Sequence, residues 1–252
     1  MDILTIILLF AAGLVAGAIN AVAGGGTFIT FAAYTLAGLP PIAASATSAI
    51  SQFPGYVTST LAYRSDIAKI WRSALLLALA SAIGSLCGAF ILLSLENDQF
   101  RALVPWLLIA ATSVFAAGPY LKPKPRPEGS PEPSGADWKS PIVQFFTAIY
   151  GGFFQAGMGI VMLATLGLTV RGDYHRLNAL KNFLSNVISF VAIAVFVSGG
   201  IVAWGYGLSA MPGVAIGGYS GVWIAKRIPQ IYLRAFVVTI GLSLAVYYFV
   251  TG

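Results

Sequence analysis

Glycines interrupt two apolar stretches, and they are the first residues whose type and spacing point to chemistry. Gly24, Gly25 and Gly26 are consecutive, and a looser group contains Gly157 and Gly159. Each glycine costs a helix roughly 1 kcal/mol relative to alanine, so such runs need a reason. Bare main-chain N–H groups at a helix start can bind an anion, helped by the positive end of the helix dipole. The alternative is close helix packing through small residues, which is common in membranes.

Neutral polar side chains lie beside both glycine groups. Asn20 precedes the triplet by one helical turn, Thr27 follows it directly, and Gln155 precedes the second group. Amides and hydroxyls can donate hydrogen bonds to an oxyanion without adding a competing negative charge. The glycine segments therefore predict a binding site for a small oxyanion.

Two polar stripes strengthen this prediction. Within 177–190, polar residues recur at spacings of three and four, which places them on one helical face. They are Asn178, Lys181, Asn182, Ser185 and Asn186. Within 44–53 the polar residues are Ser45, Thr47, Ser48, Ser51 and Gln52. A lysine at a bilayer centre costs roughly 2.5–3.5 kcal/mol, so Lys181 either extends to the interface or faces a wet, electropositive pocket.

The carboxylates are absent from the predicted membrane interior. Asp2, Asp66, Glu96, Asp98 and Asp173 all map to segment ends or loops. Proton- and sodium-coupled transporters commonly keep an acid at depth, so no deep proton carrier is predicted. An anion leaving a cell with a negative interior gains about 2.3 kcal/mol per charge per 100 mV. Export needs no coupling ion and is therefore favoured over uptake.

The other reactive side chains do not indicate catalysis or a cofactor. The single histidine, His175, falls in a loop, and the single cysteine, Cys87, falls in an apolar segment. The sequence contains no metal-ligand spacing and no Ser-His pair at membrane depth. We therefore expect no enzyme, no cofactor and no metal site.

Membrane helices must position these residues. Of the 252 residues, 58% are hydrophobic and 9% are charged, against roughly 25% charged residues in a soluble domain. The mean hydropathy is +0.86, and several uncharged runs are long enough to cross a bilayer. We predict an all-α, polytopic membrane protein whose environment is the lipid bilayer. A soluble enzyme, a disordered chain and a nucleic-acid binder are excluded.

The apolar runs form eight segments in two halves. They cover about 4–37, 45–63, 73–95, 101–119, 141–170, 178–198, 203–225 and 233–250. Residues 120–140 are rich in Pro, Ser, Gly and charge, which predicts an extended cytoplasmic linker. The domain organisation is then an N-terminal repeat at 1–119, the linker, and a C-terminal repeat at 141–252.

The two halves align at a constant offset of 133 residues without gaps. The matching pairs include Gly24 with Gly157, Gly26 with Gly159, Ala46 with Ala179, Trp71 with Trp204, Gly84 with Gly217, and Arg101 with Arg234. We interpret this agreement as an internal repeat, a common feature of transporters.

Charge placement predicts that the repeats are inverted relative to each other. By the positive-inside rule, the basic loop at 64–72 and the linker face the cytoplasm. In the second half the basic loops are 171–181 and 226–234, and they correspond to non-basic loops of the first half. Inverted repeats need an odd number of crossings per half, so one of the four segments must not cross.

The first segment of each half is the best candidate for a re-entrant hairpin, because glycines break it at 24–26 and 157–159. Non-helical backbone at membrane depth is tolerated where it is buried in protein or lines a cavity. The two glycine tips are therefore expected to meet near the midplane. The competing interpretation has eight full crossings with parallel repeats, which leaves one half in conflict with the charge rule.

Four motifs resemble the TauE/SafE family, the sulfite exporter or toluene-sulfonate uptake permeases. They are GLVAGAINAVAGGGTF at 13–28, AGLPPIAASATS at 37–48, YGGFFQAGMG at 150–159 and ALKNFLSN at 179–186. The resemblance implies a bacterial inner-membrane permease for sulfite, sulfoacetate or other organosulfonates. Asn20 stands where relatives often have Asp, and Gln155 where a Gly is usual, so coupling through an acid at position 20 is not expected.

The combined prediction is a secondary transporter or facilitator that moves a small anion. The glycine tips would supply N–H donors and Lys181 the positive charge. The selective hydrogen bonds would come from Asn20, Thr27, Thr47, Ser48, Gln52, Gln155, Asn182 and Asn186. The alternative is a non-transporting membrane scaffold or assembly subunit, in which the glycines face helices. The pattern is compatible with a homodimer, and it leaves the substrate and any coupling ion open.

Overall fold

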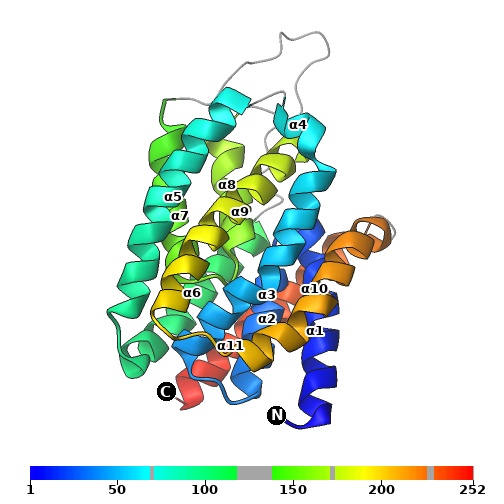
Figure 1. Ribbon diagram of the computed structural model, residues 1–252, viewed down its shortest axis with the longest axis vertical. Helices are drawn as coiled ribbons and strands as arrows, with labels where there is room; N and C mark the ends of the chain where they lie inside the picture. The colour runs from blue at the N-terminus through cyan, green and yellow to red at the C-terminus, as the bar shows by residue number, and fades with distance from the viewer. Residues whose placement is uncertain (69–70, 118–137, 171–173, 226–229, 252) are drawn as a thin grey trace.

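The protein is a helical bundle over all of the chain that can be described (Figure 1). The computed structural model describes residues 1–68, 71–117, 138–170, 174–225 and 230–251. Most of the predicted linker and the loop residue Asp173 lie outside these residues, as do parts of the basic loops 171–181 and 226–234.

The first half begins with a helical hairpin, α1 (Ile3–Ala23) and α2 (Gly26–Leu36). It continues with α3 (Pro41–Ala62), the short α4 (Arg64–Ala68), α5 (Trp71–Leu93) and α6 (Asn97–Ala117). The second half repeats this order without a counterpart of α4 in the described residues. It contains α7 (Ser140–Phe153), α8 (Met158–Thr169), α9 (Tyr174–Ser198), α10 (Trp204–Ala225) and α11 (Gln230–Thr251).

Local sequence explains where the helices begin and break. The Asp2 side chain accepts a hydrogen bond from the main-chain N–H of Thr5 at 3.0 Å and caps the start of α1, as short polar residues do at helix N-termini. Gly24 ends α1 with φ of 77°, and Gly157 precedes α8 with φ of 80°. These left-handed conformations favour glycine, and the two residues are equivalent under the offset of 133.

The offset also relates the longer helices. Helices α9, α10 and α11 begin 133 residues after α3, α5 and α6. Each predicted segment contains its expected helix with bounds that differ by only a few residues. The short α4 was not expected, because five residues are too few to show an apolar period.

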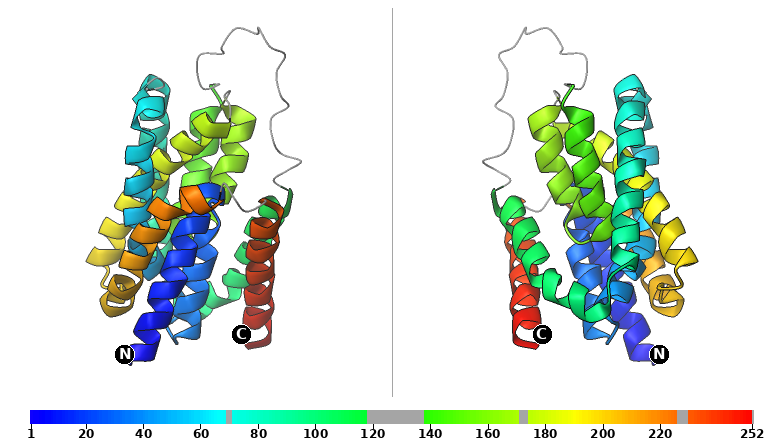
Figure 2. Two further views of the ribbon diagram at one scale, coloured as in Figure 1. Left: turned by 90° about the vertical axis from the view of Figure 1, so that its right-hand side faces the viewer. Right: turned by 90° about the vertical axis from the view of Figure 1, so that its left-hand side faces the viewer.

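The two hairpins lie at opposite ends of the bundle, and their tips meet. In Figures 1 and 2, α1 and α2 occupy the lower part and α7 and α8 the upper part, while both chain ends lie at the bottom. A Cβ atom added to Gly24 would lie 2.8 Å from the carbonyl carbon of Gly159. The inverted relation of the two halves and the end that faces the cytoplasm stay predictions.

Small residues allow the first helix of each hairpin to pack closely on a helix of the other half. Gly13 and Gly17 of α1 lie against the backbone of α10, and Gly84 and Gly88 of α5 lie against the backbone of α7. Close backbone approach through small residues is a typical way for membrane helices to associate. Helix α1 of the first half thus packs on α10 of the second, and α7 of the second half packs on α5 of the first, which interlocks the two halves.

The outer surface of the bundle is largely apolar, and its interior contains many polar side chains beside an apolar core. On α5, for example, Leu75, Leu79, Ile83 and Phe90 are exposed, whereas many serine, threonine and amide side chains are buried. Among the described residues, four helical stretches are long and apolar enough to cross a membrane: Ile3–Ala21, Ala74–Leu93, Asn97–Ala117 and Arg176–Ser198. The protein is therefore a polytopic helical membrane protein.

Candidate functional site

A chain of hydrogen bonds joins four helices beside the hairpin tips; we call it the Lys181 network, and its members are Lys181, Asn20, Gln52 and Thr30. Lys181 Nζ donates to the main-chain oxygen of Asn20 at 3.2 Å. Asn20 Nδ2 donates to Gln52 Oε1 at 3.3 Å, and Gln52 Nε2 donates to Thr30 Oγ1 at 3.3 Å. The network thus connects α9, α1, α3 and α2.

Lys181 is the charged member of the network, and its side chain has no exposed surface. The carbonyl that it contacts lies in the last turn of α1 and also accepts the N–H of Gly24, at 3.2 Å. A cation at this position interacts favourably with the negative end of the helix dipole. Within the described residues, no carboxylate contacts Lys181, so its charge is compensated only by neutral groups.

Several polar atoms around the network are buried without a hydrogen-bond partner among the described residues. They are Asn20 Oδ1, Ser48 Oγ, Tyr56 Oη, Asn182 Nδ2 and Asn186 Oδ1. Leaving such a group unpaired costs roughly 1–3 kcal/mol, and native proteins contain few of them. Three of these groups, on Ser48, Tyr56 and Asn182, can donate to an oxyanion.

The glycine tips contact each other and the surrounding helices. Gly24 and Gly159 lie backbone to backbone, and a Cβ on Gly26 would collide with the main chain of α1 at Ala16. The N–H of Gly157 donates to Thr27 Oγ1 at 2.8 Å. These contacts give the glycines a packing role, as in the alternative considered above. A direct role of their N–H groups in binding an anion stays a prediction.

The other predicted site residues form contacts with residues outside the network. Gln155 Nε2 donates to the carbonyl of Gly151 at 2.7 Å, within its own hairpin. Thr47 Oγ1 accepts the N–H of Ala203 at 3.1 Å and so anchors the start of α10. Asn186 Nδ2 donates to Thr60 Oγ1 at 2.8 Å and joins α9 to α3. Gly25 is buried against Val237 of α11.

Two residues near the network were missed by the sequence prediction. Thr30 follows Thr27 by three residues and Tyr56 follows Gln52 by four, so both share a helical face with a predicted residue. Their spacing was a usable signal. Tyr56 was overlooked because a tyrosine in an apolar segment looks like an ordinary core residue, and it is indeed 1% exposed.

The described residues contain no group of three or more His, Cys, Asp or Glu side chains that would hold a metal ion. The Lys181 network offers one cation and several neutral hydrogen-bonding groups. Such a set can bind and orient a ligand.

Helices broken at glycines beside buried polar groups, inside a bundle with an apolar surface, are typical of polytopic membrane transporters. The family comparison gives the particular family. The protein-family model described as "Sulfite exporter TauE/SafE" matches residues 9–248, so the chain belongs to the TauE/SafE family.

Similar curated proteins are all named as probable membrane transporters. One from Haemophilus influenzae is 29% identical over 243 residues, covering 94% of this chain and 91% of the relative. ORF9 of Sinorhizobium sp is 29% identical over 242 residues, covering 94% and 90%. YfcA of Escherichia coli K12 is 24% identical over 236 residues, covering 92% and 85%. No solved structure matches the chain significantly. The protein is thus a multi-pass bacterial membrane transporter rather than an enzyme.

Proposed function

We propose that this transporter moves a small oxyanion, sulfite or an organosulfonate such as sulfoacetate, out of the cell across the cytoplasmic membrane. The observation that carries the proposal is Lys181, which is wholly buried and has no carboxylate partner among the described residues. The family name supports the sulfur-containing substrate class.

The energetics of a buried charge support an anionic ligand. A cation removed from water is costly unless a counter-charge and hydrogen bonds replace its hydration. The Asn20 carbonyl replaces only part of that hydration. A sulfite or sulfonate group would bring the missing negative charge, and its oxygens would accept hydrogen bonds from Ser48, Tyr56 and Asn182.

Neutral donors would also distinguish the substrate from other solutes. A cation would meet Lys181 unfavourably, and an apolar solute would leave the polar groups unpaired, at roughly 1–3 kcal/mol each. Selectivity among anions would then depend on the number and direction of the donors. The attraction between Lys181 and a negative charge would be common to all anionic substrates.

Because the Lys181 network is buried, the substrate can reach it only if helices move. In our proposal, residues 1–119 and 141–252 are inverted repeats, and one moves against the other around the hairpin tips. The direct tip contacts include the hydrogen bond from Gly157 to Thr27 and the Gly24–Gly159 approach. On binding, the substrate competes with the Asn20 carbonyl for Lys181, which couples occupancy of the site to the end of α1.

The outward direction follows from charge. The described acids Asp2, Asp66, Glu96 and Asp98 lie at helix ends or in short connections, so none is placed to carry a proton at depth. An inside-negative potential drives an anion outward by about 2.3 kcal/mol per charge per 100 mV. Export would therefore proceed without a coupling ion.

Reconstitution tests the proposal. Purified protein in liposomes is loaded with radiolabelled sulfite or ethanesulfonate, and efflux is compared with acetate and with protein-free liposomes. We expect saturable efflux of the two sulfur anions that accelerates when a potassium gradient with valinomycin makes the interior negative. Efflux of no anion would contradict the proposal and favour the scaffold alternative; efflux insensitive to potential would contradict the uncoupled mechanism.

A further inference from the structure

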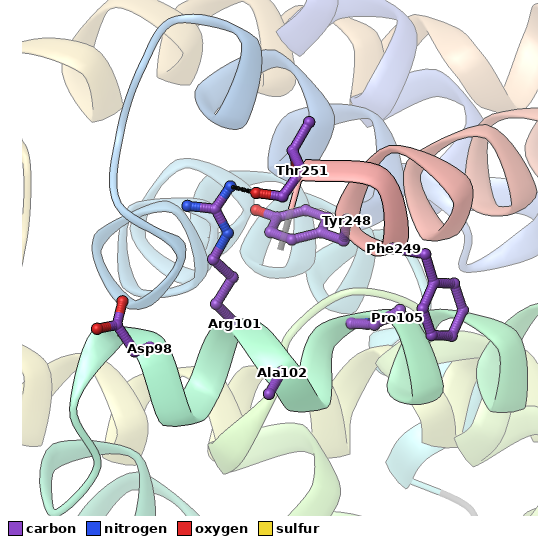
Figure 3. Close-up of a pocket in the computed structure, with 7 residues that line it drawn as sticks. All are labelled: Asp98, Arg101, Ala102, Pro105, Tyr248, Phe249 and Thr251. Carbon is purple, nitrogen blue, oxygen red and sulfur yellow. Dashed lines mark hydrogen bonds between the residues drawn. The ribbon is translucent and has the colours of Figure 1, made fainter.

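A cavity of about 410 Å³ lies between the start of α6 and the end of α11, remote in the chain from the Lys181 network (Figure 3). It is lined by Asp98, Arg101, Ala102, Pro105, Tyr248, Phe249 and Thr251. The two helix ends that form it lie at the end of the bundle where both chain termini are found (Figure 1). In a membrane, this position corresponds to the depth of the lipid headgroups.

The cavity presents an acid and a base that are not paired with each other. Asp98 and Arg101 are three residues apart on α6, a spacing at which opposite charges usually attract. Both are described, and no ion pair joins them. Instead, Arg101 Nη2 donates to the carbonyl of Thr251 at 2.6 Å, and Figure 3 shows both side chains projecting from the same side of α6. Arg101 Nε is buried without a partner.

The remaining walls are apolar and open toward the lipid-facing surface. Phe249 is 50% exposed and packs edge-to-face with Trp106, at a ring distance of 5.4 Å. Val246 and Val250 of α11 are also exposed. A ligand whose charged group lies between Asp98 and Arg101 could therefore continue into the hydrocarbon along Phe249.

We propose that this cavity binds a zwitterionic headgroup of the phosphoethanolamine type, with its ammonium at Asp98, its phosphate at Arg101 and its apolar part along Pro105 and Phe249. The charge pattern selects this class. A purely anionic headgroup would be repelled by Asp98, and a purely cationic one by Arg101. A primary ammonium also donates hydrogen bonds to a carboxylate, which a quaternary one cannot do.

The cavity is connected to the first hairpin. Tyr248 forms part of its lining, and the Tyr248 hydroxyl lies 3.0 Å from Thr35 Oγ1 of α2 in a hydrogen bond. The Tyr248 ring also stacks on Phe31 of α2, with centroids 6.1 Å apart. A headgroup that holds α6 and α11 together would therefore also stabilise the position of α2.

Native mass spectrometry of the full-length protein tests the proposal. The protein is titrated with phosphatidylethanolamine, phosphatidylglycerol and phosphatidylcholine of the same acyl composition, and the bound lipid is counted. We expect phosphatidylethanolamine to bind most tightly. Asp98→Asn and Arg101→Gln should each weaken its binding about five-fold, the effect of one modest ion pair. Arg64→Gln, which removes an exposed charge on α4, should have no effect.

One further variant and a competition experiment complete the test. Ala102→Phe fills the cavity while keeping both charges and the Arg101–Thr251 bond. It should therefore weaken phosphatidylethanolamine binding as well, which tests the site even if Arg101→Gln is unstable. Soluble phosphoethanolamine at millimolar concentration shows which part of the lipid is recognised. Displacement of the lipid would show that the headgroup alone is recognised, and no displacement would show that the acyl chains are needed. Equal binding of the three lipids, or a preference unchanged by Asp98→Asn, would overturn the proposal.

Discussion

Lys181 on α9 donates a hydrogen bond to the main-chain oxygen of Asn20, 3.2 Å away in the last turn of α1. The bond joins the second half of the chain to the first in the last helical turn of α1, four residues before the left-handed Gly24. A side chain from one half therefore contacts the point at which the hairpin of the other half reverses. If the halves move during transport, this bond must change.

Lys181→Gln should strongly reduce transport. Glutamine can still donate to the Asn20 carbonyl, so the local contact can persist while the charge is lost. Losing one charge-assisted hydrogen bond, worth about 1.5–3 kcal/mol, predicts a decrease of about ten-fold or more in ethanesulfonate efflux at low substrate. Lys139→Gln removes an exposed lysine that lies over the Trp138 ring and should leave efflux unchanged. Equal efflux in the wild type and Lys181→Gln would remove Lys181 from the site.

Asn20→Asp should make transport depend on pH. A carboxylate next to the Lys181 contact would act as an internal anion and compete with the substrate. Efflux should therefore be low where the new acid is ionised and should rise as pH falls and the acid becomes protonated. Ethanesulfonate is the appropriate substrate because its sulfonate remains ionised throughout. The wild type, measured over the same pH range, should lack this acid-dependent rise; a parallel profile in both proteins would argue against proximity of residue 20 to the substrate.

Gly24→Ala tests the packing role of the hairpin tips. The left-handed conformation costs a non-glycine residue about 1–2 kcal/mol, and the added Cβ would also lie 2.8 Å from Gly159. Gly38→Ala is a matched control, because Gly38 has φ of 87° but no neighbour within 4 Å of the added Cβ. We expect the thermal midpoint in detergent to fall more for Gly24→Ala than for Gly38→Ala. Equal decreases would mean that the tips are not tightly packed.

Hydropathy and the repeat predicted most of the fold. The eight segments followed from apolar runs long enough to span a bilayer, and the breaks at Gly24 and Gly157 followed from the conformational freedom of glycine. The packing of α1 on α10, and of α7 on α5, was not predictable in this way. Small residues mark a close contact, but they do not specify which helix provides the other surface.

The polar site was predictable in composition and less so in its connections. The stripe spacing put Lys181 on a polar helical face but left open whether its side chain extends to the interface or lies in the interior. The structure buries it against the Asn20 carbonyl. The same spacing could not assign Thr47 to the N–H of Ala203 or Asn186 to Thr60. Those contacts depend on how α3 packs against α10 and α9, which is a property of the tertiary structure.

Cysteine accessibility tests the inverted repeats directly. Ser65 on α4 and Ser198 at the end of α9 are both exposed. Helix α4 lies at the top of Figure 1, and the junction of α9 with α10 lies in its lower half. In a Cys87→Ala background, an impermeant maleimide added to intact cells should label Ser198→Cys, whereas Ser65→Cys should react only after permeabilisation. Since the charge rule places 64–72 in the cytoplasm, labelling of both from the same side would support eight full crossings with parallel repeats.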